Sequence, residues 1–359
     1  MAEWDFVAAP ATVSVDFGVS QANIIVNMLH LLNTVEHNDG FSQWTVDTYH
    51  ALTEEEKLRN QLASMLIEPG TYPPTYTQFS QILDDIKAAD AESLRDMALK
   101  PILELEEPPT VAQVMASADA LVEYSYKVAA EYGKVDDYNE ADWRWTYSQL
   151  VDADAFKQMA VDHLTMMWDR FYRDQWTRNE SMLLESRDAY LQMNMSSYSD
   201  VFAAIEAVTG RNMRGIDKME KHFEKINHVT FMPVTHLGPY ISWERRDENN
   251  AIIFFTARLP SNTRQSSSAL NRNELLVRLN ALADDTRLSI LEMLVAEEEL
   301  CAQDFINRLD LSQSSASRHL RQLTASGFLN ERRRDVAKCY SLNSERIEDT
   351  MKALKRLLT

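Results

Sequence analysis

The sequence predicts a mainly α protein with small β content: a helical N-terminal domain with a small antiparallel sheet, followed by a smaller C-terminal domain. Three observations support this fold class. Apolar residues recur every three or four positions over long stretches up to about residue 226, as on a buried helix face. Before residue 270, alternating, strand-like runs appear at the start of the chain and at 228–258. After residue 270, short helical patterns precede two strand-like runs, and 359 residues suffice for two or three domains.

The first elements are an alternating run at 12–17 and a helix over 21–32. Ser20 is the expected N-cap of that helix, because its hydroxyl can accept hydrogen bonds from the free amides of the first turn. Further helices are expected near 76–88, 91–99, 111–132, 153–179, 199–208 and 216–226.

Aromatic side chains are densest between residues 143 and 176, where methionines are also frequent. This composition suits a pocket for an apolar effector, with Trp143, Trp145, Trp168, Tyr172 and Trp176 as candidate lining residues. The alternative is a helical core, because Phe156, Leu164 and Met167 recur at the spacing of a buried face. We favour the core and keep the pocket as a second interpretation.

Strand patterns follow at 228–234 and in a hairpin near 240–258 that turns at 247–250. The opening strand is a candidate to join that sheet. A polar stretch then predicts a linker at 261–270. We therefore expect an accessory and candidate sensor domain at 1–260 and a separate domain at 271–359.

The last domain begins with helical patterns that include 287–294 and 301–309. The next helix starts after Ser312, an expected N-cap, and ends at Gly327, which suits the left-handed position after a helix. The runs 328–334 and 338–342 can then pair as a hairpin.

This arrangement resembles the winged helix-turn-helix of the ArsR family of bacterial repressors. The resemblance rests on Leu282-Ala283-Asp284-Asp285-Thr286-Arg287-Leu288, Ser314-Ser315-Ala316-Ser317-Arg318-His319-Leu320, Arg332-Arg333 and Tyr340-x-Leu342. It implies a recognition helix in the major groove of DNA, a wing on the flanking backbone, and a two-fold dimer made by the outer helices.

The polar face of the recognition helix combines short donors and acceptors with arginines, which can bridge O6 and N7 of guanine. The alternative is a solvated helix face, which is common. The candidate DNA-binding residues, wing included, are Gln313, Ser314, Ser315, Ser317, Arg318, His319, Arg321, Gln322, Arg332, Arg333, Arg334 and Lys338. The candidate dimer-interface residues, on helices 272–281 and 344–358, are Leu275, Leu276, Leu279, Ile347, Met351, Leu354 and Leu358.

Two departures from the family pattern bear on function. The wing tip carries Asp335 and Val336 where a glycine and an arginine are usual, which removes a minor-groove contact. Metal-sensing members often hold two cysteines where this chain has Cys301 and Gln303, and one thiolate does not hold a soft ion. We therefore expect no metal site of these types, and we interpret Cys301 as a small buried residue. Cys339 is a weaker candidate for a redox role.

The formal net charge is −19, yet Lys plus Arg and Asp plus Glu balance at 14 each from residue 271 to the end. The acidic excess therefore lies upstream, and residues 311–343 hold six basic side chains against two acidic ones. Two cysteines in 359 residues favour a reducing cytoplasm over a disulfide scaffold. No apolar run approaches 18 residues, so we expect no membrane partner.

We interpret the chain as a dimeric, sequence-specific regulator of transcription and expect a repressor. Double-stranded DNA and a second copy are its expected partners, a small-molecule effector is a further candidate, and no cofactor is implied. The alternative is a ligand- or protein-binding module whose winged helix contacts protein. A third hypothesis, an enzyme fused to a DNA reader, finds no phosphate loop, nucleophile elbow or zinc-protease pair in the sequence.

Overall fold

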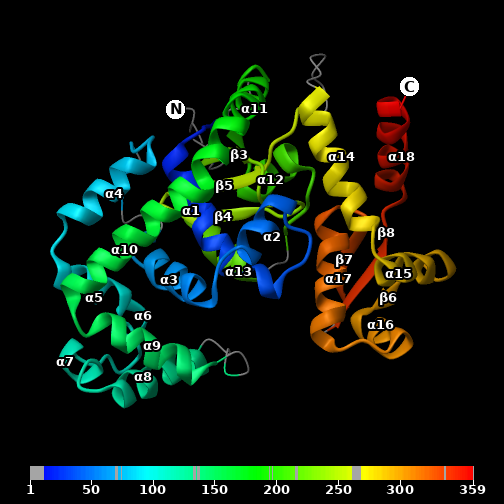
Figure 1. Cartoon of the computed structure of the whole chain (residues 1–359). Helices are drawn as coiled ribbons and strands as arrows, with labels where there is room; N and C mark the ends of the chain where they lie inside the picture. Colours follow the sequence, from blue (N-terminus) through cyan, green and yellow to red (C-terminus); the bar gives the residue numbers. More distant parts are fainter. Residues whose placement is uncertain are drawn as a thin grey trace, which may run out of the picture. The chain divides into compact units, whose positions relative to one another are not determined.

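The computed structural model describes residues 12–68, 72–73, 75–131, 135, 138–193, 195, 197–214, 217–260, 268–334 and 337–358. Its internal contacts divide the chain into two compact units. Unit 1 consists of residues 1–19, 34–46 and 179–359, and unit 2 of residues 20–33 and 47–178. Figure 1 shows helices in both units, with the sheets in unit 1.

Unit 2 is helical and is organised around α10 (Ala153–Met167), which packs against α3, α4, α5 and α9. Side chains at helical spacing along α10, including Phe156, Leu164 and Met167, are buried, so the core interpretation of this segment is confirmed. The other helices of this unit are α1 (Gln21–Leu32), α3 (Glu54–Ser64), α4 (Phe79–Ala88), α5 (Ala91–Ala98), α6 (Lys100–Leu103), α7 (Val111–Val114), α8 (Ala118–Glu131) and α9 (Glu140–Leu150).

The predicted helix bounds hold best where a side chain caps the helix. Ser20 accepts from the Asn23 amide at the start of α1, as expected. The helical segment predicted at 153–179 extends further in the structure, to Leu191. There α10 continues through a π-helical turn, Trp168–Tyr172, into α11 (Arg173–Leu191). The predicted helix 111–132 is divided into α7 and α8. The helices α2 (Gln43–His50), α3 and α9 were not predicted.

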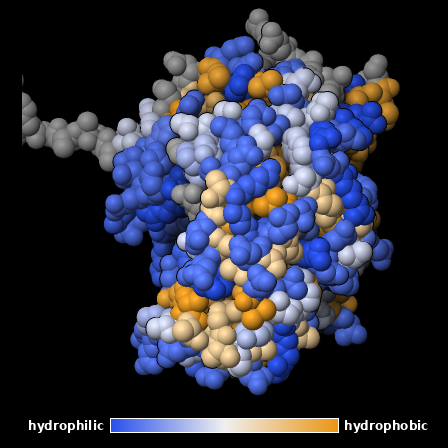
Figure 2. All heavy atoms as spheres, turned by 60° about the vertical axis from the view of Figure 1, so that its left-hand side comes forward, coloured by the Kyte–Doolittle hydropathy of each residue, from blue (hydrophilic) through white to orange (hydrophobic). Residues whose placement is uncertain are grey.

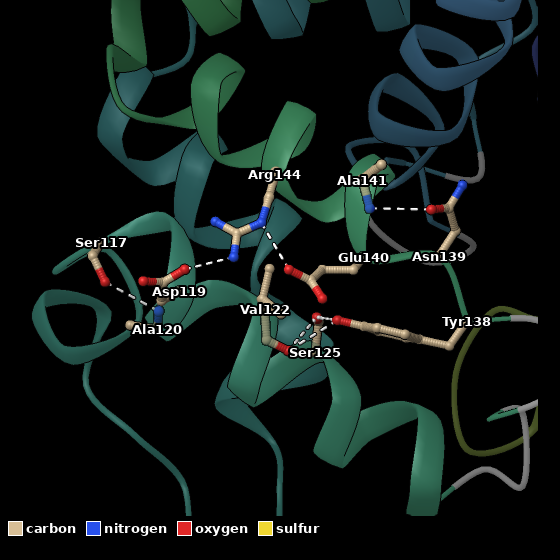
Figure 3. Close-up of polar contacts among 10 residues, drawn as sticks. All are labelled: Ser117, Asp119, Ala120, Val122, Ser125, Tyr138, Asn139, Glu140, Ala141 and Arg144. Atoms are coloured by element: carbon tan, nitrogen blue, oxygen red, sulfur yellow. Dashed lines mark hydrogen bonds and ion pairs between the residues drawn. The ribbon is translucent and has the colours of Figure 1, made fainter.

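The pairing of α8 and α9 shows how polar contacts order this part of unit 2 (Figure 3). Arg144 of α9 bonds Asp119 of α8 at 2.6 Å and Glu140 of its own helix at 2.8 Å. The Tyr138 hydroxyl donates to the Val122 carbonyl at 3.0 Å, and Asn139 caps α9. These contacts tie the connection between the two helices to α8.

Unit 1 contains a five-stranded sheet of order β2-β1-β3-β5-β4 among the described residues. Its strands are β1 (Val13–Phe17), β2 (Ser197–Tyr198), β3 (His228–Val234), β4 (Ser242–Arg245) and β5 (Asn250–Thr256). The predicted hairpin is present as β4 and β5, and the opening strand does join the sheet. The expectation of a purely antiparallel sheet was wrong, because β3 pairs in parallel with both β1 and β5.

The sheet's apolar face packs on two short helices, α12 (Val201–Thr209) and α13 (Asp217–Phe223). Phe17, Phe231 and Phe255 are buried there, together with Ile205 and Val208 of α12. β3 reads as a nearly continuous buried run, which is usual for a strand flanked by parallel neighbours.

The C-terminal part of unit 1 is a winged helix-turn-helix, as predicted. Its elements are α14 (Ser268–Leu282), α15 (Asp285–Ala296), β6 (Leu300–Cys301), α16 (Ala302–Leu309), α17 (Gln313–Ala325), β7 (Leu329–Arg334), β8 (Ala337–Leu342) and α18 (Ser344–Leu358). The three strands pair in the order β6-β8-β7 over a core that includes Phe305, Leu323 and Phe328. The wing tip at 335–336 and most of the expected linker, 261–267, lie outside the described residues.

Hydrophilic side chains cover most of the face drawn in Figure 2, with small apolar groups between them. No helix in the described ranges is both long and apolar enough for a bilayer crossing.

Candidate nucleic-acid interface

The recognition helix α17 is held at both ends by the signals that predicted it. Ser312 accepts from the Ser315 amide at 3.1 Å, and Asp310, at φ 50°, ends α16 in the left-handed conformation. Gly327, at φ 81°, follows the last turn. Ala316, Leu320 and Leu323 are buried, so the opposite face of α17 is left for solvent or a partner.

The structure places most of the candidate DNA-binding residues on the surface. Ser315 and Arg318 are half-buried. The exposed candidates are Gln313, Ser314, Ser317, Arg321, Arg332, Arg333, Arg334 and Lys338. His319 and Gln322, which were also candidate DNA contacts, are buried in this structure. A helical spacing locates a face only to within about one residue on either side, and these two lie at its edge.

His319 faces the start of α15, where its Nδ1 lies 3.5 Å from the Asp284 carboxylate. Burial lowers the pKa of the imidazole, partly offset by the negative charge of Asp284. Asp284 also caps α15 through the Arg287 amide at 2.9 Å. His319 therefore helps to join α17 to α15 inside the domain.

Gln322 is covered by the segment 38–40, which also belongs to unit 1. A Cβ built on Gly40 would stand 2.7 Å from the Gln322 amide, and the φ of Gly40 is +91°. The backbone conformation therefore favours glycine there, and any other residue would also displace the Gln322 side chain.

The same segment contacts the two arginines of α17. Arg321 donates to the Asn38 side chain, and Arg318 Nε lies 3.9 Å from Asp39 Oδ2. The Tyr240 hydroxyl donates to the Asp39 carbonyl and so holds the segment to the sheet. Both arginines keep access to solvent, because the Arg318 side chain is 39% exposed and Arg321 is exposed as well.

The wing presents a second cationic group. Arg332 makes a two-point contact with Glu299, Arg334 lies 3.8 Å from the same carboxylate, and Lys338 bonds Glu331 at 2.7 Å. The hydrogen bond from Arg332 lowers the pKa of Glu299. Because such exposed pairs are weak, the wing arginines can exchange Glu299 for a phosphate at little cost.

Cys301 and Cys339 are joined by a disulfide between β6 and β8. Cys301 is buried, as predicted, but the expectation of unpaired cysteines was wrong. Sequence reasoning missed the bond because 38 residues separate the two, and only the pairing of β6 with β8 makes them partners. Within the described residues, no three metal-binding side chains gather into a candidate ion site.

The two outer helices of the winged domain, α14 and α18, pack against each other (Figure 1). Of the candidate interface residues, Leu275 is buried between elements of the same chain. Leu276, Met351 and Leu358 are 54%, 47% and 77% exposed. Leu279, Ile347 and Leu354 are intermediate.

The candidate effector residues lie on three successive elements: Trp143 and Trp145 on α9, Trp168 and Tyr172 in the π-helical turn, and Trp176 on α11. Tyr172 is fully buried, and this burial raises its pKa well above the usual range. Trp168 packs against Phe79 with ring centres 6.0 Å apart. Trp143, Trp145 and Trp176 are half-buried.

Comparisons with known proteins agree with this geometry. Residues 282–332 match a family model described as a helix-turn-helix domain. The transcriptional activator HlyU of Vibrio cholerae is 37% identical over 87 residues, which are 24% of this chain and 80% of that protein. The arsenic resistance regulator ArsR1 of Pseudomonas putida is 42% identical over 64 residues, 18% of this chain and 50% of that protein.

The arsenical resistance operon repressor of Escherichia coli is 48% identical over 52 residues, which are 14% of this chain and 44% of that protein. Fold, surface and relatives together define a winged helix-turn-helix regulator that binds DNA. The chain belongs to the ArsR family of transcriptional regulators.

Proposed function

We propose that this protein is a dimeric, sequence-specific repressor that reads double-stranded DNA with α17 and grips the flanking backbone with the wing. The observation that carries the proposal is the exposed face of α17, where Gln313, Ser314 and Ser317 stand beside Arg318 and Arg321. Side chains of this kind recognise base edges in the major groove, and an arginine can bond a guanine at two points.

The wing supports this division of labour. Its three consecutive arginines are exposed, and we assign them to phosphates of the flanking backbone. The remainder of the chain carries the acidic excess, which limits non-specific attachment to DNA. Relatives with operon repressor in their names favour repression, whereas HlyU is named an activator.

A second copy is expected to cover the exposed leucines and methionine of α14 and α18. An unpaired apolar strip on two packed helices is what a symmetric helical interface leaves in a single chain. Such a dimer would place two recognition helices about 34 Å apart, one turn of DNA.

The test is a selection of bound sequences from a random duplex library, followed by affinity measurements with full-length protein. We expect the selected duplex to bind at least tenfold more tightly than a scrambled one at physiological salt, with one dimer per two-fold site. Equal affinity for both duplexes would reject sequence-specific regulation and favour the alternative, a module that contacts protein through its winged helix. We propose no catalytic activity for the chain.

A further inference from the structure

We propose that a hollow inside unit 1, between the five-stranded sheet and the winged domain, binds an oxyanion: the carboxylate or phosphate group of a small metabolite. The hollow is partly open to solvent. Four arginines line it, Arg211 and Arg258 from the sheet side and Arg278 and Arg346 from the winged domain.

Each arginine donates a hydrogen bond to a nearby backbone or side-chain group. Arg211 donates to the Pro239 carbonyl at 3.1 Å, and Arg258 donates to the Val208 carbonyl and to the Tyr190 hydroxyl. Arg346, at the start of α18, donates to the Ser326 carbonyl at 3.3 Å. A guanidinium has five N–H donors, so these neutral acceptors leave most of them for a ligand.

The charges of the hollow are unbalanced. Glu274, which bonds Arg278 at 2.5 Å, is the one carboxylate among its described lining residues. Arg278 is 9% exposed, and its Nε has no hydrogen-bond partner in the described structure. Four positive charges thus face one negative charge in a partly buried space, where cations without counter-charges are costly.

Two of these arginines, Arg211 and Arg346, have lowered pKa values. Burial, together with the neighbouring arginines, lowers the pKa of Arg211 and of Arg346 to about 10 each. Both guanidinium groups remain charged near neutral pH, so the repulsion persists. A bound anion would relieve it, because opposite charge nearby stabilises the protonated form.

The chemistry of the walls sets the class of ligand. Guanidinium groups present paired N–H donors that match the oxygens of a carboxylate or phosphate. Phe255, Ile241 and Val277 supply an apolar part to the lining, which suits an organic anion over a fully hydrated salt ion. The ligand is therefore a small organic acid or phosphate ester.

The position of the hollow implies a regulatory use, which rests on the proposed function. Its walls include the last turn of α17 at Ala325 and Ser326, and the sheet loop that carries Tyr240. Tyr240 holds the segment 38–40 that contacts Arg318 and Arg321. An anion that draws the arginines together would stabilise the arrangement in which this segment covers α17, and so weaken DNA binding.

The test is the thermal stability of the full chain in phosphate, succinate or chloride at one ionic strength. We expect Tm to rise with millimolar phosphate or succinate relative to chloride, since a ligand that binds only the folded state raises its stability. The larger of the two effects identifies the phosphate or the carboxylate source. Equal Tm values in all three salts would overturn the proposal.

Substitutions locate the effect. Arg346→Gln and Arg211→Gln should reduce the anion-dependent rise in Tm, measured against each variant's own Tm in chloride, at least by half. Arg308→Gln is the matched control, since Arg308 makes an exposed pair with Glu297 on α16. An unchanged rise in both hollow variants would refute the site.

DNA affinity provides an independent readout. Phosphate or succinate should weaken binding to the selected duplex several-fold in wild type and less in Arg346→Gln. If no duplex is bound selectively, the proposed function fails while the Tm series still decides the anion site. If DNA binds but is insensitive to the anion, the regulatory use is refuted.

Discussion

The contact between segment 38–40 and α17 leads to a specific prediction: substitutions in that segment should increase affinity for DNA. Asn38→Ala removes the acceptor of the Arg321 hydrogen bond without any change of charge. Asp39→Ala removes the carboxylate that lies 3.9 Å from Arg318. Arg321 and Arg318 could then bind a duplex without first breaking their contacts with Asn38 and Asp39.

The expected size follows from the exposure of these groups. One hydrogen bond contributes about 0.5–1.5 kcal/mol net, and an exposed ion pair about 0–1 kcal/mol. The double variant should therefore gain about 1–2 kcal/mol, or about 5- to 30-fold in Kd. This is an upper estimate, because the Tyr240 bond to the Asp39 carbonyl survives both substitutions.

The assay is fluorescence anisotropy with a labelled selected duplex and full-length protein at physiological salt. Glu206→Ala is the control, since it removes one exposed carboxylate from α12, away from the segment. The charge-neutral Asn38→Ala separates release of α17 from simple electrostatics, and we expect about two- to tenfold tighter binding from it. Unchanged or weaker binding by both single variants would refute the idea that this segment competes with DNA.

The remaining predictions concern the same surfaces. Arg318→Ala should reduce the preference for the selected sequence by about 1–3 kcal/mol, whereas Arg333→Ala should weaken selected and scrambled duplexes alike; equal effects would contradict the division between base and phosphate contacts. About four phosphate contacts per subunit predict a slope of log K against log salt near −7, and a slope shallower than about −3 would mean far fewer contacts. Leu276→Asp with Met351→Asp should give monomers by sedimentation, and a persistent dimer would place the interface elsewhere. His163 is buried with its pKa lowered to about 4, so the unfolded state binds its proton first; stability should be complete above about pH 6.5 and fall towards pH 4 by up to about 1.4 kcal/mol per pH unit. His163→Gln should flatten that loss in a pH series of denaturant unfolding.

Local signals in the sequence account for much of what is observed. The helix–turn–helix and its wing follow from caps, spacing and turn residues that each act on their immediate neighbours, such as Ser312 and Gly327 at the two ends of α17. The bounds of α1 and β3 agree with the sequence pattern for the same reason. The open polar face of α17 was likewise visible in the order of residues, apart from its edge at His319 and Gln322.

The helices α2, α3 and α9 were not predicted, because their apolar spacing is too weak to indicate a helix. Thr53 makes a capping box at the start of α3, but the helix has a weak apolar pattern among many charged residues. α2 and α9 are short and mostly polar, so their helical character depends on packing in the fold.

The sequence by itself determined that a DNA-reading domain lies near the carboxyl end and that basic side chains outnumber acidic ones within residues 311–343. Only the tertiary structure decided that β1 pairs in parallel with β3, that Cys301 meets Cys339, and that four arginines converge on one hollow. It also placed segment 38–40 on α17, and the two hydrogen-bonded residues Asn38 and Arg321 are 283 positions apart in the chain. Caps and spacing act over a few residues, whereas these contacts depend on the chain folding back on itself, which no local pattern records.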